Sequence, residues 1–141
     1  MDDRQAIVEV LIEAAWIFDH KQWERMAEVF TPDAVAYGQR GLEAITANTI
    51  GYLGGCGPTQ HLLGNHRVRV DGDRASVTSY VRAFHLRAGV DPMQRAEPDR
   101  YWDFLGEYHD TLVRTADGWR IASRVCTPTA GTGRLELTAT P

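Results

Sequence analysis

Residues 67–77 read RVRVDGDRASV, and this stretch decides which kind of fold the chain can adopt. Val68 and Val70 alternate with arginines before an Asp-Gly-Asp turn, and Ala75 and Val77 resume the alternation after it. An apolar residue at every second position predicts a β-strand with one buried face, and a short Gly-containing turn between two such strands predicts an antiparallel hairpin. The stretch therefore indicates a sheet that covers a core with one of its faces.

The strand after this turn extends the alternation. Val81 and Ala83 share its apolar face, and His85 falls in the same register, so a histidine is directed toward the interior. Residues 88–100 contain two prolines and are predicted to form a long hairpin connection that acts as a flexible flap.

Two further strands complete the predicted sheet. They are expected over residues 101–114 and 119–125, joined by a turn at Ala116-Asp117-Gly118. Residues 127–141 are rich in Thr, Gly and Pro, and are predicted to be a loop or a cap over a cavity.

The half of the chain before the hairpin follows a helical period. Asp2 or Asp3 can cap a first helix whose apolar residues recur every three to four positions as far as Phe18. A short second helix is expected over residues 23–30, and a third from about residue 42 to residue 52. A turn at Thr31-Pro32-Asp33 and a brief strand over residues 34–37 are predicted between them.

Helices followed by an antiparallel meander indicate the α+β class. The chain has 141 residues, of which 43% are hydrophobic, and this is enough for one core, so residues 1–141 are expected to form a single domain. Three N-terminal helices packed on a strongly curved, mostly antiparallel sheet would leave a cone-shaped pocket.

Composition excludes several classes of partner. The net charge is −4, and the sequence has no long run of Lys or Arg, so neither nucleic acid nor an anionic membrane is expected as a partner. No stretch approaches the roughly 20 apolar residues of a membrane-spanning helix. Cys56 and Cys126 stand in unrelated contexts, which predicts reduced thiols and a cytoplasmic location.

The sequence TQHLLGNH at residues 59–66 is the main sign of chemistry. His61 stands among apolar residues, Asp19 follows the apolar run of the first helix, and His85 faces the interior, so three ionisable groups converge on one space. Strict alternation from Val68 would bury His66 in place of His61, and a bulge at Gly64 would resolve this conflict.

These residues give the chain a resemblance to a known family. It resembles the SnoaL-like group of the nuclear transport factor 2-like superfamily, which has a cone-shaped α+β barrel, and within it the scytalone dehydratases, the bile-acid 7α-dehydratases and, more distantly, hexachlorocyclohexane dehydrochlorinase. The landmarks that carry the resemblance are Phe18-Asp19 with Trp23, Phe30-Thr31-Pro32-Asp33-Ala34, Thr59-Gln60-His61, Gly72-Asp73-Arg74-Ala75 and Asp117-Gly118-Trp119-Arg120-Ile121.

The resemblance implies four catalytic residues. It pairs Asp19 with His61 as an acid–base dyad, assigns Tyr37 to the substrate oxygen, and makes His85 a second acid–base group. The dehydratases also use a tyrosine at or shortly before the helical Asp, and this chain lacks it because Phe18 and Ala14 stand there.

The resemblance also implies two substrate contacts. Arg124 is the candidate for an arginine of the last strand that the dehydrochlorinase uses, and Trp23 is the candidate aromatic contact. A homodimer or homotrimer is expected. No cofactor and no metal is expected, since the five histidines lack ligand spacing.

The chemistry of these side chains supports the implied roles. A neutral histidine is the best base near pH 7, and a carboxylate on its other ring nitrogen fixes the tautomer and stabilises the imidazolium. The sequence thus predicts a cofactor-independent dehydratase-type lyase acting on a cyclic hydroxy or keto small molecule, steroid-, polyketide- or aromatic-like. An isomerase or cyclase of the same fold, or a non-catalytic ligand-binding or dimerisation module, remains an alternative.

Each residue also has a structural interpretation. Asp19 can cap the next helix, His61 can be a buried histidine with its hydrogen bonds satisfied, and Tyr37 can be a core aromatic with its hydroxyl at the rim. His85 would face solvent after a slip in strand register. Direct contact between Asp19 and His61 inside a cavity would decide in favour of catalysis.

Overall fold

The structure, a computed structural model, describes residues 1–137 and contains one six-stranded sheet in the order β2-β1-β6-β5-β4-β3. Its strands are β1 (Phe30–Ala36), β2 (Gln39–Arg40), β3 (Cys56–Asp71), β4 (Arg74–Arg87), β5 (Tyr101–Thr115) and β6 (Gly118–Gly133). The helices are α1 (Asp3–Asp19) and α2 (Leu42–Leu53), with short 3₁₀ turns η1 (Trp23–Glu28) and η2 (Pro98–Arg100).

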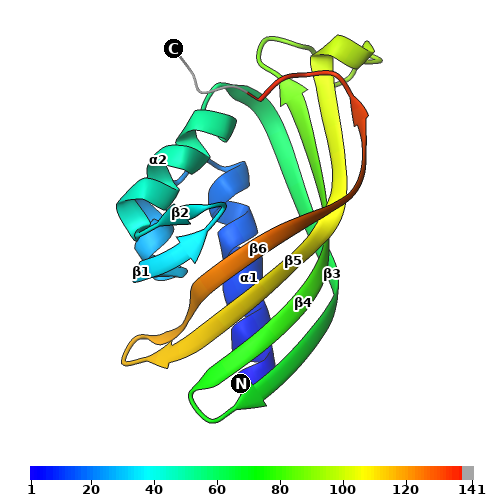
Figure 1. Cartoon of the computed structure of the whole chain (residues 1–141). Helices are drawn as coiled ribbons and strands as arrows, with labels where there is room; N and C mark the ends of the chain where they lie inside the picture. Colours follow the sequence, from blue (N-terminus) through cyan, green and yellow to red (C-terminus); the bar gives the residue numbers. More distant parts are fainter. Residues whose placement is uncertain (138–141) are drawn as a thin grey trace.

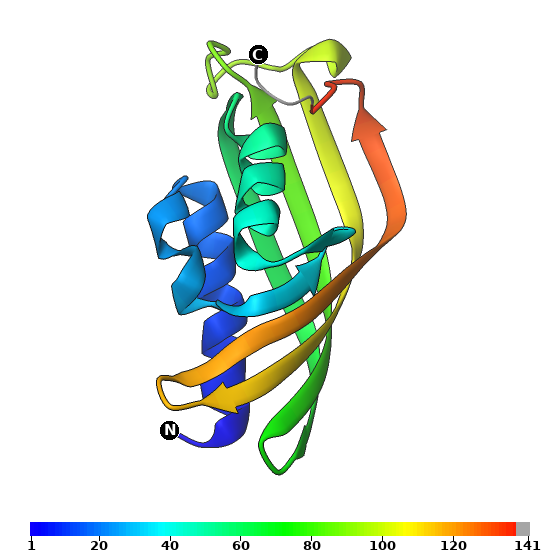
Figure 2. The same cartoon turned by 60° about the vertical axis from the view of Figure 1, so that its left-hand side comes forward.

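The sheet is strongly curved, and α1 and α2 lie on its concave side (Figures 1 and 2). All neighbouring strands are antiparallel except β1 and β6, which are parallel. The α+β class and the mostly antiparallel sheet are confirmed. A closed barrel is not formed, because β2 and β3 are the two ends of the sheet order and do not pair with each other.

The expected group of three N-terminal helices is only partly correct. α1 begins at the predicted cap, where the Asp2 carboxylate accepts a hydrogen bond from the Gln5 N–H at 2.8 Å. The second expected helix is a single 3₁₀ segment, η1, and the β1–β2 hairpin precedes α2. Within residues 1–137 no helix combines the length and the apolar character needed to cross a membrane.

The predicted turn at Thr31-Pro32-Asp33 is wrong, since these residues belong to β1. Pro32 and Asp33 are both exposed, and the register with β6 shifts between Phe30 and Val35. The turn-forming residues therefore produce an irregularity inside a strand, where the missing N–H of proline is tolerated.

β3 begins at Cys56, well before the alternation that starts at Arg67, so His61 lies inside this strand and does not precede it. The predicted bulge is present: the pairing with β4 shifts between Gly64 and Arg67, and Asn65 has φ of +52°. The shift lets both His61 and His66 face the concave side, where the Nδ1 of His66 lies 2.8 Å from the Ser79 hydroxyl.

The hairpin turns fall where the sequence placed them. Asp71 pairs with Arg74, and Thr115 pairs with Gly118, so each turn has a two-residue loop. Residues 88–100 connect β4 to β5 at the end of the sheet opposite these turns (Figure 1).

The expected loop after residue 126 is wrong for its first part. Thr127–Gly133 continues β6 and pairs with β5 as far as Trp102. The chain then turns over the end of the sheet, where the Leu135 N–H donates to the Tyr101 carbonyl at 3.1 Å. Residues 138–141 of the expected cap lie outside the described residues.

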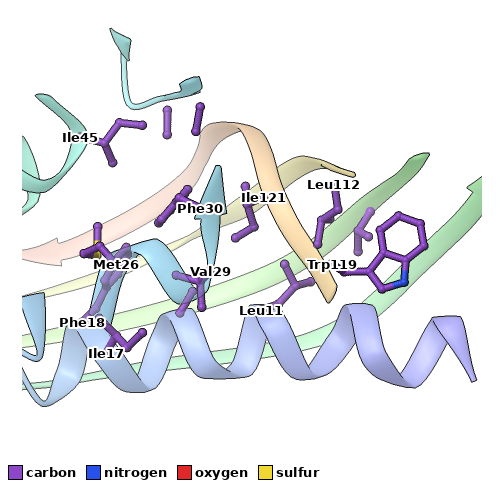
Figure 3. Packing of buried hydrophobic residues seen from close by; sticks show 14 of the residues in the cluster. Leu11, Ile17, Phe18, Met26, Val29, Phe30, Ile45, Leu112, Trp119 and Ile121 are labelled. Carbon is purple, nitrogen blue, oxygen red and sulfur yellow. The ribbon is translucent and has the colours of Figure 1, made fainter. Parts of the chain in front are cut away.

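The main hydrophobic core lies between α1 and the half of the sheet that carries the two hairpin turns, the lower half in Figure 1. Figure 3 shows its packing from close by. Leu11 and Ile17 from α1 meet Val29, Leu112 and Ile121 from the strand side, and all of these are at most 1% exposed. This core fills the narrow part of the fold, so the open space lies toward the other end of the sheet.

Replacing Leu11 by alanine should lower the free energy of unfolding by about 2–5 kcal/mol, because the side chain is fully buried and its removal leaves a cavity. Urea unfolding of the variant measures this loss. Ile12→Ala is the matched control, since Ile12 is its neighbour on α1 and is 45% exposed. Equal losses in the two variants would contradict the packing described here.

Candidate active site

A cavity of about 400 Å³ opens between the end of α1, α2, the β1–β2 hairpin and the upper half of the sheet. Its walls are mostly aromatic and apolar, with a few polar groups. The lining residues are Phe18, Tyr37, Gln39, Asn48, Thr49, Tyr52, Leu53, His61, Ala83, His85, Trp102, Phe104, Tyr108, Cys126 and Leu137.

Asp19 and His61 are in direct contact. The Asp19 Oδ1 accepts hydrogen bonds from the His61 Nδ1 at 2.6 Å and from the Thr59 hydroxyl at 2.9 Å, and its Oδ2 accepts from the His61 N–H at 3.0 Å. Thr59 and His61 are two residues apart on β3 and so point to the same face. The Thr-Gln-His motif is thus a cradle that binds one carboxylate through three donors.

This cradle keeps the Asp19 carboxylate ionised. Burial raises the pKa of Asp19, but hydrogen bonds from the His61 ring, the His61 N–H and Thr59 outweigh it and hold the pKa below the ordinary value. An ionised carboxylate can only accept hydrogen bonds, so in the neutral ring of His61 the proton lies on Nδ1 and Nε2 is unprotonated. His61 lines the cavity, whereas Asp19 does not line it and lies behind His61 in a separate pocket beside α1.

His85 is directed into the same cavity from β4. It is 3% exposed, its ring lies 5.7 Å from that of His61, and it stacks on Trp102. Its Nδ1 donates to the Trp102 carbonyl at 2.9 Å, which leaves Nε2 as the unprotonated nitrogen of the neutral ring. Burial lowers the pKa of His85 and the neighbouring His61 lowers it further, although the Trp102 carbonyl acts in the opposite direction.

The lowered pKa of His85 should make the protein less stable in mild acid. The unfolded chain binds a proton on His85 more tightly than the folded chain does. The contribution of His85 to the free energy of unfolding is therefore most favourable above its ordinary pKa of 6.5, and stability falls as the pH drops below that value. The midpoint of thermal unfolding between pH 7 and pH 5 should therefore decline less in His85→Gln than in the wild type. His20→Gln, an exposed position, is the control, and an unchanged slope in His85→Gln would contradict the assignment.

Tyr37 lines the cavity from the two-residue turn between β1 and β2. Its φ is +53° and that of Gly38 is +73°, which is the backbone of a type I′ turn. A non-glycine residue with a bulky side chain rarely adopts this conformation. A strained tyrosine at this turn indicates a functional role for its side chain in the cavity. The Tyr37 hydroxyl oxygen accepts a hydrogen bond from the Arg124 Nη1 at 3.3 Å.

Arg124 and Asp110 form a buried ion pair behind Tyr37. The Arg124 Nε and Nη2 donate to the two carboxylate oxygens of Asp110 at 2.7 and 3.0 Å, and the side chains are 1% and 0% exposed. Arg124 is not among the residues that line the cavity, but its Nη1 donates to Tyr37, which does line it. The substrate contact that the resemblance implies for Arg124 stays a prediction.

Trp23 is not brought to the cavity. It is half-buried in η1 and packs against the main core, with no place among the cavity-lining residues of the described chain. A 3₁₀ turn presents its side chains at a different angle from the helix expected there. The substrate contact predicted for Trp23 has no support from its position.

Tyr108 and Asp110 on β5 are functional candidates that sequence reasoning did not identify. Both are buried and alternate with Leu112 on the concave face. Asp110 falls on the same face of β5 as the core residue Leu112, and a buried carboxylate needs a buried cation as its partner. This requirement is the sequence signal that could have linked Asp110 to Arg124. Within residues 1–137, no three His, Cys, Asp or Glu side chains are grouped so as to hold a metal ion.

Comparison with known proteins assigns the chain to a family. A family model described as a SnoaL-like domain matches residues 1–125. The chain belongs to the SnoaL-like family. The uncharacterized SnoaL-like relative Rv2910c of Mycobacterium tuberculosis is 34% identical over 132 residues, covering 89% of this chain and 84% of that protein.

Solved structures share the SnoaL-like fold over most of their length. The Kfla4162 protein of Kribbella flavida has a TM-score of 0.78 and 29% identity, with 92% of both chains covered. A protein of Novosphingobium aromaticivorans, provisionally assigned as a scytalone dehydratase, has a TM-score of 0.80 and 23% identity over 98% of this chain and 91% of its own. A hexachlorocyclohexane dehydrochlorinase, LinA type 2, has a TM-score of 0.77 and 18% identity over 98% and 93%.

Proposed function

We propose that this protein is a cofactor-independent lyase of the dehydratase type, which acts on a small cyclic hydroxy or keto compound. The observation that carries the proposal is the 2.6 Å contact between Asp19 and His61, with the free Nε2 of His61 at the wall of a cavity. A passive binding pocket has no need of a carboxylate held by three donors behind an imidazole.

The first half of the reaction is the removal of a proton from the carbon next to a carbonyl. The Nε2 of His61 takes this proton, and Asp19 stabilises the imidazolium that forms. Negative charge develops on the carbonyl oxygen, to which Tyr37 donates its hydroxyl proton in a hydrogen bond. One donor of this kind stabilises the transition state by about 3 kcal/mol.

The second half is the loss of the hydroxyl group. The carbon–carbon double bond forms as the carbon–oxygen bond breaks, and the His61 imidazolium returns its proton to the leaving oxygen to make water. His85 is neutral near pH 7 and has a bare Nε2, so it accepts a hydrogen bond from the substrate hydroxyl and positions it. General acid–base assistance of this kind accelerates a reaction by about 10²- to 10⁴-fold.

The cavity supports a hydrophobic cyclic substrate. Phe18, Trp102 and Phe104 supply flat apolar walls, and about 400 Å³ lies within the range of about 300–1,000 Å³ of small-molecule sites. Two distant structural neighbours are a protein provisionally assigned as a scytalone dehydratase and a hexachlorocyclohexane dehydrochlorinase, and both names describe eliminations, the reaction class of this proposal.

The test is an assay with a set of cyclic β-hydroxy ketones in deuterated water. Elimination is followed by the ultraviolet absorbance of the conjugated product, and deuterium at the α-carbon of recovered substrate reports proton removal alone. A conjugated product supports the lyase; exchange or rearrangement without loss of water would instead assign an isomerase or cyclase. Tight binding with neither result would leave a ligand-binding module.

A homodimer or homotrimer and a cytoplasmic location stay predictions from the sequence. The convex face of the sheet carries several large apolar side chains that are more than one-third exposed, namely Leu62, Tyr80, Leu105 and Val125. Cys56 and Cys126 are both free thiols, as expected for a reducing compartment.

A further inference from the structure

We propose that Tyr108 is a second hydrogen-bond donor of the cavity, which together with Tyr37 binds one negatively charged oxygen of an enolate-like or phenolate-like ligand. Its role in turnover rests on the proposed function, whereas its role in binding does not. The inference comes from how three strands bring two phenols to one guanidinium.

The strand register places the two tyrosines on either side of Arg124. Ala36, the last residue of β1, pairs with Arg124 on β6, so Tyr37 follows directly beside it. On the other side, β5 pairs Asp110 with Arg124 and Tyr108 with Cys126. Tyr37, Tyr108 and Cys126 line the cavity, and the Arg124–Asp110 pair lies directly behind them.

One guanidinium contacts both phenols. The Cζ of Arg124 lies 3.9 Å from the centre of the Tyr108 ring, and its Nη1 donates to the Tyr37 hydroxyl oxygen at 3.3 Å. Asp110 occupies the Nε and Nη2, so the pair is electrically neutral and its position is set by two further hydrogen bonds. In this proposal the arginine supports the Tyr37 hydroxyl and the Tyr108 ring and does not itself bind the ligand.

The surroundings of the two hydroxyls favour donation of a hydrogen bond. The Tyr37 oxygen already accepts from a cation, and such a chain of hydrogen bonds polarises its own O–H. Burial, followed by the neighbouring Tyr37, raises the pKa of Tyr108 well above the usual value, so Tyr108 stays protonated. Two neutral O–H donors beside an internally balanced ion pair are suited to an oxyanion and offer little to a cation.

The two histidines of the cavity have the opposite character. In the neutral rings of His61 and His85 the Nε2 atoms are acceptors, because each Nδ1 donates to a carboxylate or a carbonyl. The histidines therefore offer acceptors from β3 and β4, and the two tyrosines offer donors from the β1–β2 turn and from β5.

The experiment uses 4-nitrophenol, whose yellow phenolate reports its ionisation on binding. Wild-type protein should bind the phenolate in preference to the phenol, and Tyr108→Phe should bind the phenolate about 10- to 100-fold more weakly, as expected for loss of a hydrogen bond to a charged oxygen. Tyr37→Phe should show a similar loss. Tyr80→Phe is the control, because Tyr80 is 57% exposed on the convex face.

A neutral ligand separates hydrogen bonding from packing. 4-Nitroanisole carries no ionisable oxygen, so its affinity should be the same in the wild type and in Tyr108→Phe. Equal loss of both ligands would mean that the variant has lost its fold around the cavity, and thermal unfolding of Tyr108→Phe would show this directly. Unchanged phenolate affinity in a folded Tyr108→Phe, or no preference for phenolate in the wild type, would overturn the proposal.

This result is independent of the proposed reaction. A His61→Gln variant should still bind 4-nitrophenolate while losing elimination activity. If Tyr108→Phe weakens phenolate binding but no elimination is found with any substrate, the two-phenol site stands and the lyase proposal fails. If His61→Gln abolishes elimination but Tyr108→Phe binds phenolate normally, the reverse holds.

Discussion

Replacing His61 by glutamine should lower elimination activity by about 10³-fold or more, while the midpoint of thermal unfolding stays close to that of the wild type. Glutamine fills most of the space of the imidazole and can still bind the Asp19 carboxylate, but it cannot take a proton at the position of Nε2. Steady-state kinetics on any substrate found by the elimination assay, together with thermal unfolding, measure both quantities.

Asp19→Asn is the companion variant. The amide keeps the size of the side chain but removes the charge that stabilises the imidazolium and selects the Nδ1–H tautomer of His61. Its activity should fall by about 10³- to 10⁴-fold, and the loss should not add to that of His61→Gln in the double variant, because the two residues act as one unit. Full activity in Asp19→Asn with a large loss of stability would mean that the contact is structural.

Arg124→Met should produce the largest loss of stability among single substitutions in this region, about 3–5 kcal/mol in the free energy of unfolding. The reason is the Asp110 carboxylate, which is 0% exposed and would be left buried without its cation. Urea unfolding measures the loss. Arg114→Met is the matched control: Arg114 also binds an aspartate, Asp3, through two hydrogen bonds, but it lies at the surface and should cost far less.

A double variant identifies the cause. Arg124→Met combined with Asp110→Leu removes both charges and should recover most of the stability, since a buried ion pair can often be replaced by apolar side chains of similar volume. Phenolate binding should not recover in the double variant, because Tyr37 has lost the Nη1 donor that supports its hydroxyl. Failure of the double variant to recover stability would show that packing around Arg124 matters more than the charge left on Asp110.

The pairing of Asp19 with His61 was expected from the family resemblance, whereas local features of the sequence place each residue only within its own element. Asp19 ends a helix that its own apolar period defines, and Thr59 and His61 reach the same face of β3 by being two residues apart. The limits of β1 and β6 were less predictable. Turn-forming Pro32 and the Gly-rich stretch after Thr127 are normally signals against a strand, yet pairing with neighbouring strands outweighed their local preference.

The sequence by itself determined the α+β class and the two hairpin turns of the meander, since each follows from periodicity within a few residues, while the pairing of Asp19 with His61 was implied by the family resemblance. Only the tertiary structure showed that Arg124 contacts both Tyr37 and Tyr108. That arrangement joins strands separated by up to 87 residues and depends on register shifts such as the one between Thr111 and Leu112. A shift of one residue turns every following side chain to the opposite face of the sheet, and the sequence around Thr111 and Leu112 carries no signal of it like the one at Gly64.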